Sequence, residues 1–435
     1  MFYYSKNFNL IGSTTNFGID NNNTIQNNSI QINNLNIGNI FIHNNIDNDN
    51  FFLTNQIDNN FTNYIPKLNN RIYQNNNNKS LIFKNNNFNY KYGISNIFYS
   101  LKEIIEKSDI ICQNQSGCRY LEKKIDENPE IALSIYPNIK NKINILMFDP
   151  FGNYYIQKLI QYINIIQINE IITYIISHNF LEICLNQYGT RVIQKLIERI
   201  FNNNLLLEKF NILLFPNLYK IFINQYATHI IIKYMSYIPF PKNKNIIVFI
   251  QKNILNLSTH KHSVCTLQKI IESLDNPQRK MLLMNIAQIS NKLFNDQFGN
   301  YVVQFALSMN EPEVNNFIIN NYLKDFKNNS CRKYSSNVFE KCFEYSTYEI
   351  KQMIIANVCT YSYVQTLLYD IYGNYVLQKI IQESSEPYKT YFIKLIVSLI
   401  DGLKNFPYGT IIFQKLVTNF PVILNYVHIK TNNYK

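Results

Sequence analysis

Two kinds of hydrophobic pattern divide the chain near residue 93. Residues 1–92 contain runs of asparagine, such as those at 21–23 and 75–78, and sustain neither a 3.6-residue nor a 2-residue hydrophobic period. Such a segment buries too little apolar surface to offset the entropy of ordering it, so we expect it to be disordered. From residue 93 onward, apolar residues recur at i, i+3, i+4 and i+7, which predicts amphipathic helices.

The helical pattern repeats with an almost constant period. We take as anchor the residue just before each expected second helix, and successive anchors are 35, 37, 38, 36, 36, 36, 38 and 36 residues apart. The anchors are Gly117, Gly152, Gly189, Ala227, Ser263, Gly299, Ser335, Gly373 and Gly409. A typical unit has one amphipathic segment over 168–186 and a second helix over 190–201. No such unit can bury its apolar stripe alone, so the period predicts an all-α solenoid of eight stacked units with atypical ends.

An unusual polar set occupies the second helix of several units. Gly-Asn-Tyr-x-x-Gln occurs at 152–157, 299–304 and 373–378. Residues four apart lie above one another on a helix, so we expect Asn153 and Gln157 on one exposed face, with Tyr154 beside them. Two amides provide the donors and acceptors that match the Watson-Crick edge of uracil. The tyrosine ring provides a surface on which a base can stack.

One unit carries a variant of this set. Ser336, Asn337 and Glu340 stand where the other units have Asn, Tyr and Gln. A carboxylate only accepts hydrogen bonds, so Glu340 suits the two N–H donors on the edge of guanine. This one change predicts a different base preference for this unit.

The net charge, the spacing of the cysteines and the lack of catalytic motifs narrow the range of possible functions. A net charge of +12 and a pI near 9.1 favour a polyanionic partner. Seven cysteines without a C-x-x-C pair indicate reduced thiols rather than a zinc site or a disulfide scaffold. Neither a secretory leader nor an apolar run of about 18 residues is evident, so we expect a cytoplasmic protein without membrane contact. Catalytic motifs are also missing, which argues against an enzyme and against any metal or cofactor.

The repeat cores resemble those of the Pumilio (PUF) homology domain. The strings FGNYYIQKLI, YGTRVIQKLI, FGNYVVQF, SSNVFEKC and YGNYVLQKII are all similar to that family's repeats. The resemblance covers residues 93–432 and implies a right-handed, crescent-shaped solenoid of eight repeats with capping half-repeats. It also implies that each repeat reads one base of single-stranded RNA, with the last repeat at the 5′ end.

The resemblance assigns two edge-reading positions and one stacking position to each repeat. The implied edge-reading residues are Cys118, Glu122, Asn153, Gln157, Thr190, Gln194, Thr228, Val264, Gln268, Asn300, Gln304, Ser336, Glu340, Asn374 and Gln378. The implied stacking residues are Arg119, Tyr154, Arg191, His229, Cys265, Tyr301, Asn337 and Tyr375.

These sets imply an RNA element close to 5′-UGU(A/N)N-A-U-(A/G). Repeats eight, seven and six give the initial UGU, repeat three matches the family's adenine set, and repeat two gives uracil. Repeat four has the apolar Ile232 at its second edge position, and repeat five has the bulky Val264 at its first, so both are expected to discriminate weakly. Repeat one, with Cys118 and Glu122, could take A or G.

The resemblance further implies a monomer that binds mRNA 3′ untranslated regions and represses translation or destabilises the message. Protein corepressors, as yet unidentified, are expected on the convex face. Two alternatives remain open: a nucleolar Pumilio-like factor of ribosome assembly, and an armadillo-like or HEAT-like solenoid that binds protein. The last class has repeats of roughly 40 residues or more and no need for paired amides on one face.

Overall fold

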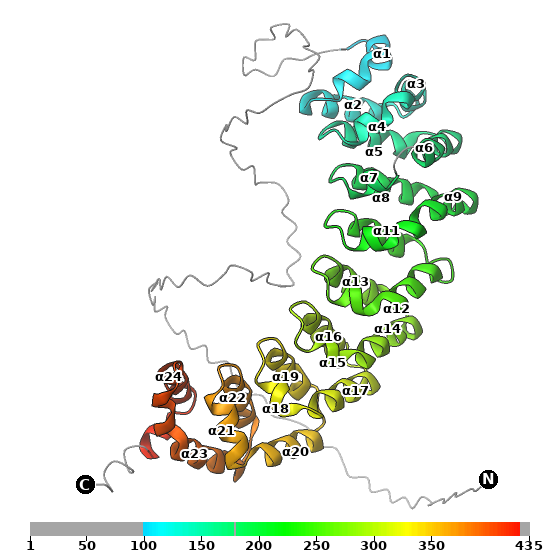
Figure 1. The fold of residues 1–435 in the computed structure, drawn as a ribbon. Helices are drawn as coiled ribbons and strands as arrows, with labels where there is room; N and C mark the ends of the chain where they lie inside the picture. Colours follow the sequence, from blue (N-terminus) through cyan, green and yellow to red (C-terminus); the bar gives the residue numbers. More distant parts are fainter. Residues whose placement is uncertain (1–98, 178–179, 427–435) are drawn as a thin grey trace, which may run out of the picture. The chain divides into compact units, whose positions relative to one another are not determined.

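The computed structural model describes residues 99–177 and 180–426. The chain divides into residues 1–91 and 92–435, and all of the described helices belong to the second unit (Figure 1). Within the described ranges every regular element is a helix, in agreement with the 3.6-residue pattern. The tract predicted to be disordered, residues 1–92, lies outside the described residues.

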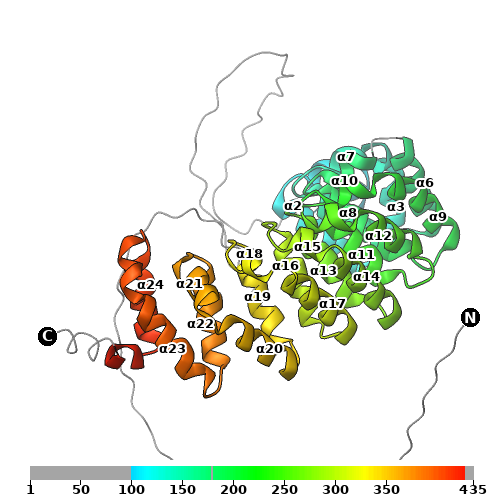
Figure 2. The same cartoon turned by 60° about the horizontal axis from the view of Figure 1, so that its bottom comes forward.

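Two rows of helices run along the second unit. The helices that begin at or near the anchors form what we call the motif row, and each packs beside the next (Figures 1 and 2). The motif row comprises α2 (Gln115–Glu127), α5 (Gly152–Tyr162), α8 (Gly189–Ile200), α11 (Thr228–Tyr237), α13 (Ser263–Ser273), α16 (Gly299–Ser308), α19 (Ser335–Glu344), α22 (Gly373–Glu383) and α24 (Gly409–Asn419). The opposite row comprises α1 (Leu101–Ile111), α3 (Glu130–Ile139), α6 (Ile165–Ser177), α9 (Asn204–Leu214), α12 (Lys244–Ser258), α14 (Asn276–Gln288), α17 (Pro312–Leu323), α20 (Tyr348–Val358) and α23 (Tyr388–Leu399).

A short third helix connects the two rows in most repeats. These connectors are α4 (Ile143–Met147), α7 (Phe180–Leu185), α10 (Leu218–Phe222), α15 (Ser290–Leu293), α18 (Phe326–Ser330) and α21 (Tyr361–Tyr369), with 3₁₀ turns η1 (Lys140–Lys142), η2 (Phe215–Asn217) and η3 (Ile400–Asn405). The amphipathic segment predicted over 168–186 contains α6 up to Ser177 and α7 from Phe180, and residues 178–179 between them lie outside the described residues. In the fourth repeat Pro216 follows α9 and lacks the N–H that would continue that helix.

The anchors mark the helix starts to within a residue or two. Seven of the nine are the first residue of their helix rather than the residue before it, and Ala227 precedes α11 as predicted. At Gly189 the reason for glycine is a close approach between helices. A Cβ atom there would lie 2.5 Å from the carbonyl oxygen of Ile183 in α7, so a side chain would force the connector away.

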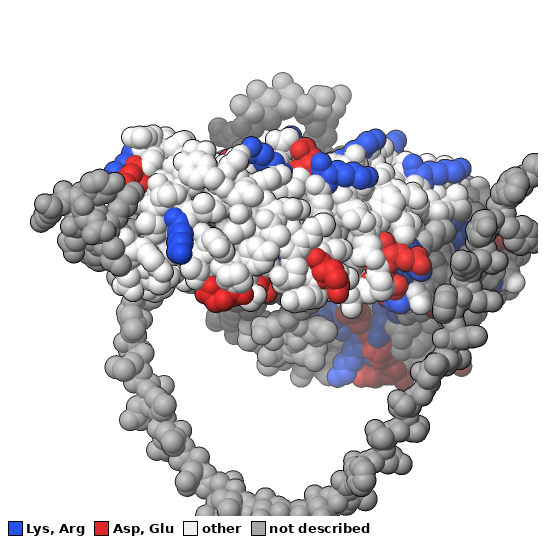
Figure 3. All heavy atoms as spheres, turned by 90° about the horizontal axis from the view of Figure 1, so that it is seen from below, with Lys and Arg blue, Asp and Glu red and all other residues white. Residues whose placement is uncertain are grey.

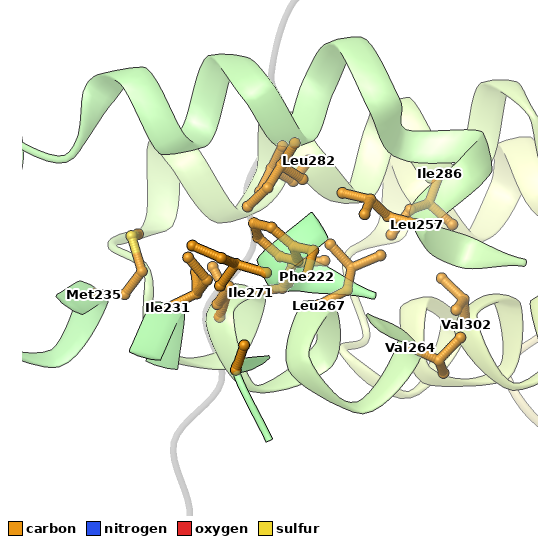
Figure 4. Packing of buried hydrophobic residues seen from close by; sticks show 14 of the residues in the cluster. Phe222, Ile231, Met235, Leu257, Val264, Leu267, Ile271, Leu282, Ile286 and Val302 are labelled. Carbon is orange, nitrogen blue, oxygen red and sulfur yellow. The ribbon is translucent and has the colours of Figure 1, made fainter. Parts of the chain in front are cut away.

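The repeats share one hydrophobic core. A single buried cluster extends from Ile104 to Ile423, so it spans nearly all of the described chain. Figure 4 shows how it is built: Phe222 of α10, Ile231 of α11 and Leu267 of α13 meet between consecutive repeats. Each repeat buries its apolar stripe against its neighbours, which is the property that defines a solenoid.

Candidate RNA-reading surface

A side-chain oxygen three residues before the anchor fixes the turn into most motif helices. Oδ1 of Asp149 accepts hydrogen bonds from the backbone N–H groups of Phe151 and Gly152, at 2.9 and 2.6 Å. The equivalent residue makes the same pair of bonds in four further repeats, namely Asn186, Asn224, Asp296 and Asp370. These turns set the direction of each motif helix. Sequence reasoning missed them, although Asp or Asn at a constant offset from the anchor is a visible signal.

The asparagine of each Asn-Tyr-x-x-Gln set is buried. Asn153 is 0 % exposed, Asn300 1 % and Asn374 2 %. In each case Nδ2 donates to two backbone carbonyls of the preceding turn, at 2.8 to 3.1 Å. The prediction that both amides lie on the exposed face is therefore wrong for the asparagine, because its N–H groups point back to carbonyls of the turn before the helix.

The asparagine in turn orients the glutamine. Since Nδ2 of Asn153 is committed to carbonyls, its Oδ1 faces outward and accepts a bond from Nε2 of Gln157 at 3.1 Å. Gln304 bonds to Asn300, and Gln378 to Asn374, in the same way at 3.0 Å. Gln157 and Gln304 are half-buried, and within the described ranges their Oε1 atoms have no partner. In repeat six the glutamine thus presents one acceptor and one N–H donor, which matches adjacent groups on uracil. In repeat two Nε2 of Gln157 also donates to the backbone carbonyl of Asn153 at 3.2 Å, so the free group there is the acceptor Oε1.

All eight predicted stacking side chains are exposed. Each lies two residues after its anchor. The rings of Tyr154, Tyr301 and Tyr375 are about half accessible, at 48 %, 47 % and 51 %. The others, also exposed, are Arg119, Arg191, His229, Cys265 and Asn337. Because motif helices pack side by side, these side chains recur once per repeat along one row.

In repeats one, three and five an edge-reading side chain bonds to the next repeat. Sγ of Cys118 donates to the carbonyl of Phe151, and Oγ1 of Thr190 to that of Tyr226, both at 3.2 Å. In repeat five Nε2 of Gln268 donates to the carbonyl of Tyr301 at 3.3 Å, while Val264 is buried. These groups join neighbouring repeats, which leaves fewer polar atoms for a base.

Repeats four and seven lie at opposite extremes of polarity. In repeat four Thr228 is buried and Ile232 is half-buried, so little there can bond a base edge. Partial desolvation, with the nearby cations Lys269 and Arg191, lowers the pKa of His229 below its ordinary value, which favours the neutral imidazole. In repeat seven the carboxylate of Glu340 is exposed and forms no hydrogen bond or ion pair with another described residue, although its charge acts on the adjacent Lys341.

The first repeat places a second carboxyl group in a different setting. Glu122 is half-buried, and its desolvation raises the pKa of the carboxyl above the ordinary value, while nearby Lys158 opposes this shift. A carboxyl that takes up a proton more easily can donate as well as accept a hydrogen bond. This agrees with the weaker base preference expected for repeat one.

Lysines follow the second edge position in most repeats, but acidic side chains pair with them. Lys158 contacts Asp126, and Lys233 contacts Glu198, each at 2.6 Å and each across a repeat boundary. Lys341 and Lys379 pair with glutamates of their own helices. These ion pairs reduce the positive charge along the motif row. The amide and carboxylate sets therefore contribute more to RNA binding there, relative to the net charge of +12.

Residues 99–177 and 180–426 contain neither a metal-binding cluster nor a membrane-spanning helix. No cluster of three or more His, Cys, Asp or Glu side chains there could hold a metal ion. In the same ranges no helix is both long enough and apolar enough to cross a membrane.

Known proteins with similar sequences share this repeat. The model of the Pumilio-family RNA binding repeat matches residues 110–132, 142–176, 179–203, 253–287, 295–321, 333–359 and 364–397. The longest stretch between matched segments, 204–252, contains most of repeat four, the one with Ile232. A Pumilio domain-containing protein of Schizosaccharomyces pombe is 30 % identical over 73 % of this chain and 47 % of its own length. Pumilio homolog 11 of Arabidopsis thaliana is 31 % identical over 70 % and 55 %. The matched region thus spans about half the length of these relatives.

Solved structures with a similar fold contain RNA. The Puf4 RNA binding domain, bound to a 3′ UTR recognition sequence of HO endonuclease RNA, is 29 % identical with a TM-score of 0.62, over 70 % of this chain and 97 % of that one. The RNA-binding domain of yeast Puf5p, bound to AAT2 RNA, is 27 % identical with a TM-score of 0.57, over 74 % and 98 %.

Proposed function

The chain belongs to the Pumilio family of RNA-binding repeat proteins, and from this premise we propose that it reads single-stranded mRNA one base at a time along the motif row. The family and its solved neighbours are RNA-binding repeat proteins and not enzymes. One observation carries the proposal: an exposed stacking side chain lies beside an amide or carboxylate at the same place in repeat after repeat. This is the arrangement that a one-base-per-repeat code needs.

The proposed element is 5′-UGU(A/N)N-A-U-(A/G), with repeat eight at the 5′ end. Repeat six presents a donor and an acceptor beside a tyrosine, and repeat two presents an acceptor beside a tyrosine, which supports uracil. The unpaired carboxylate of Glu340 supports guanine at the second position. Repeats four and five offer little that is free to bond a base, which supports tolerance there. We place this binding in the 3′ untranslated regions of cytoplasmic messages, acting as a monomer that represses or destabilises them.

Binding of the full chain to UGUAUAUA is expected to be tight, and changing UGU to ACA should weaken it by at least about 100-fold, since each lost base contact costs roughly 1–3 kcal/mol. Fluorescence anisotropy at one fixed, near-physiological salt concentration measures both. Equal, weak and steeply salt-dependent binding to the two RNAs would mean that charge alone holds RNA. That outcome would favour the ribosome-assembly or the protein-scaffold alternative.

The opposite row has features that suit a protein partner rather than nucleic acid. Consecutive helices expose apolar side chains, among them Met281 of α14, Phe317 of α17, Met353 of α20 and Tyr391 of α23. Hollows lined by Met281 and by Phe317 with Met353 lie between the first three. The face in Figure 3, which includes α20 and α23, is largely uncharged, with most basic and acidic side chains along its rims. We propose that these exposed apolar side chains of α14, α17, α20 and α23, here called the apolar stripe, form the docking site of a protein corepressor. Such a corepressor would carry apolar side chains spaced by one repeat.

Replacing Phe317 and Met353 together by Asp should abolish repression of a reporter mRNA that carries UGUAUAUA, because a charged stripe cannot bury against an apolar partner. RNA affinity should stay within about twofold, since the motif row is untouched. The matched control replaces the exposed neighbours Asn316 and Asn357 by Asp, which adds the same charge beside the stripe. Full repression by the Phe317/Met353 variant would rule out this surface.

A further inference from the structure

The last motif helix contacts the reading set of repeat eight. α24 lies beside α22 (Figure 2), and Nδ2 of Asn419 donates to Oε1 of Gln378 at 2.6 Å. From the same helix, Nζ of Lys415 lies 4.4 Å from the centre of the Tyr375 ring and bonds to the tyrosine hydroxyl. Two of the three reading residues of repeat eight are therefore engaged by α24.

Repeats two and six have no such contacts within the described ranges. Oε1 of Gln157 and of Gln304 is without a partner, and both side chains are half-buried, whereas Gln378 is only 4 % exposed. The Tyr154 and Tyr301 rings likewise have no cation over them among the described residues. The difference lies in the neighbour, since the Asn-Tyr-x-x-Gln set is the same in all three repeats.

The direction of each amide in this contact follows from the backbone. Nδ2 of Asn374 faces two carbonyls, those of Asp370 and Ile371, which only accept hydrogen bonds, so Oδ1 of Asn374 must point to Gln378. Gln378 must then turn its Nε2 inward, and its Oε1 faces α24. Asn419 can meet that oxygen only with its N–H group. Asn419 therefore covers Oε1 of Gln378, whose side chain is only 4 % exposed, so a base can reach that oxygen only by displacing Asn419.

We propose that Asn419 and Lys415 are specificity-determining residues of repeat eight, which they hold closed in the RNA-free protein. This inference rests on the proposed base-reading function. The base at the 5′ end has to displace Asn419 from Gln378, and Lys415 from the face of Tyr375, before it can bond and stack. Reading of the first base is therefore weaker than reading of the third, although repeats eight and six carry the same residues.

The test measures the affinity of the full chain and of its Asn419→Ala variant for three RNAs, UGUAUAUA, AGUAUAUA and UGAAUAUA. In the unaltered chain the change at base one should cost clearly less affinity than the change at base three. Asn419→Ala should tighten binding of UGUAUAUA by about threefold to tenfold, the worth of one released hydrogen bond, and leave AGUAUAUA unchanged. Thr418→Ala is the control, because Thr418 is exposed on the same helix and bonds only within it.

Each outcome decides between distinct interpretations. Weaker binding of UGUAUAUA by Asn419→Ala would overturn the proposal and make Asn419 a base contact. An unchanged affinity would show that the Asn419–Gln378 bond does not oppose RNA, which also overturns it. Loss of the penalty at base three in the unaltered chain would instead refute the base-reading function itself. Matching thermal melting midpoints would establish that the variants are folded.

Discussion

Changing Ser336 to Asn and Glu340 to Gln in repeat seven is expected to switch its preferred base from guanine to uracil. The carboxylate of Glu340 only accepts hydrogen bonds and has no partner among the described residues, so it is free for the N–H groups of guanine. The backbone is already suited to the new pair. In repeat six Asn300 bonds to carbonyls four and three residues before it, and the equivalent carbonyls before Ser336 belong to Arg332 and Lys333.

The expected change is large in both directions. One matched or mismatched base is worth roughly 1–3 kcal/mol, so the variant should lose about 10- to 100-fold affinity for UGUAUAUA and gain a similar factor for UUUAUAUA. Titrations of both RNAs at one salt concentration measure the ratio. Glu344→Gln is the control, since it removes a charge from the same helix one turn away. A variant that still prefers guanine would show that Glu340 does not face the second base.

Replacing Tyr322 by Ala is expected to cost about 3–5 kcal/mol of stability, the usual loss for a fully buried ring. The side chain is 0 % exposed and packs against Phe294, just after the connector α15, Phe326 of the connector α18 and Phe339 of the motif helix α19. Its hydroxyl donates to the carbonyl of Ser335 at 3.0 Å, at the start of α19. One side chain thus joins repeats six and seven.

Tyr322→Phe separates the ring from the hydroxyl, and it should cost only about 1 kcal/mol. Tyr348→Ala removes a ring that is 71 % exposed and should change stability by less than about 0.5 kcal/mol. Urea denaturation followed by circular dichroism compares the three, and the transition should broaden for Tyr322→Ala because neighbouring repeats separate. Equal losses for Tyr322→Ala and Tyr348→Ala would contradict the packing described for α17.

The architecture could be predicted because it is periodic, whereas the hydrogen bonds of the site depend on local backbone geometry. Anchors such as Gly152 and Gly299 recur at a fixed spacing, and that spacing places the helix starts to within a residue or two. Helical spacing also exposes Tyr154 and Tyr301 correctly, since ring position depends on rotation about the axis alone.

Burial of Asn153 could not be read from the same spacing. It arises because Nδ2 of Asn153 donates to carbonyls of the turn just before the helix, and a helical wheel contains no turn. The contact of Asn419 with Gln378 joins residues 41 positions apart, so only a three-dimensional structure reveals it.

The bonds of Cys118 and Thr190 to the following repeat have a consequence for engineering. Each of these two side chains occupies a base-reading position of the proposed code and also forms a hydrogen bond to the adjacent repeat. Exchanging Thr190 for Asn, in order to change the base that repeat three reads, would also remove the hydrogen bond to the carbonyl of Tyr226. Repeats two and six, whose asparagines bond to carbonyls of the turn just before their own helix, lack this coupling and are the safer places to rewrite the target. Base preference can thus be changed without loss of such a bond between repeats in some repeats of this chain, but not in others.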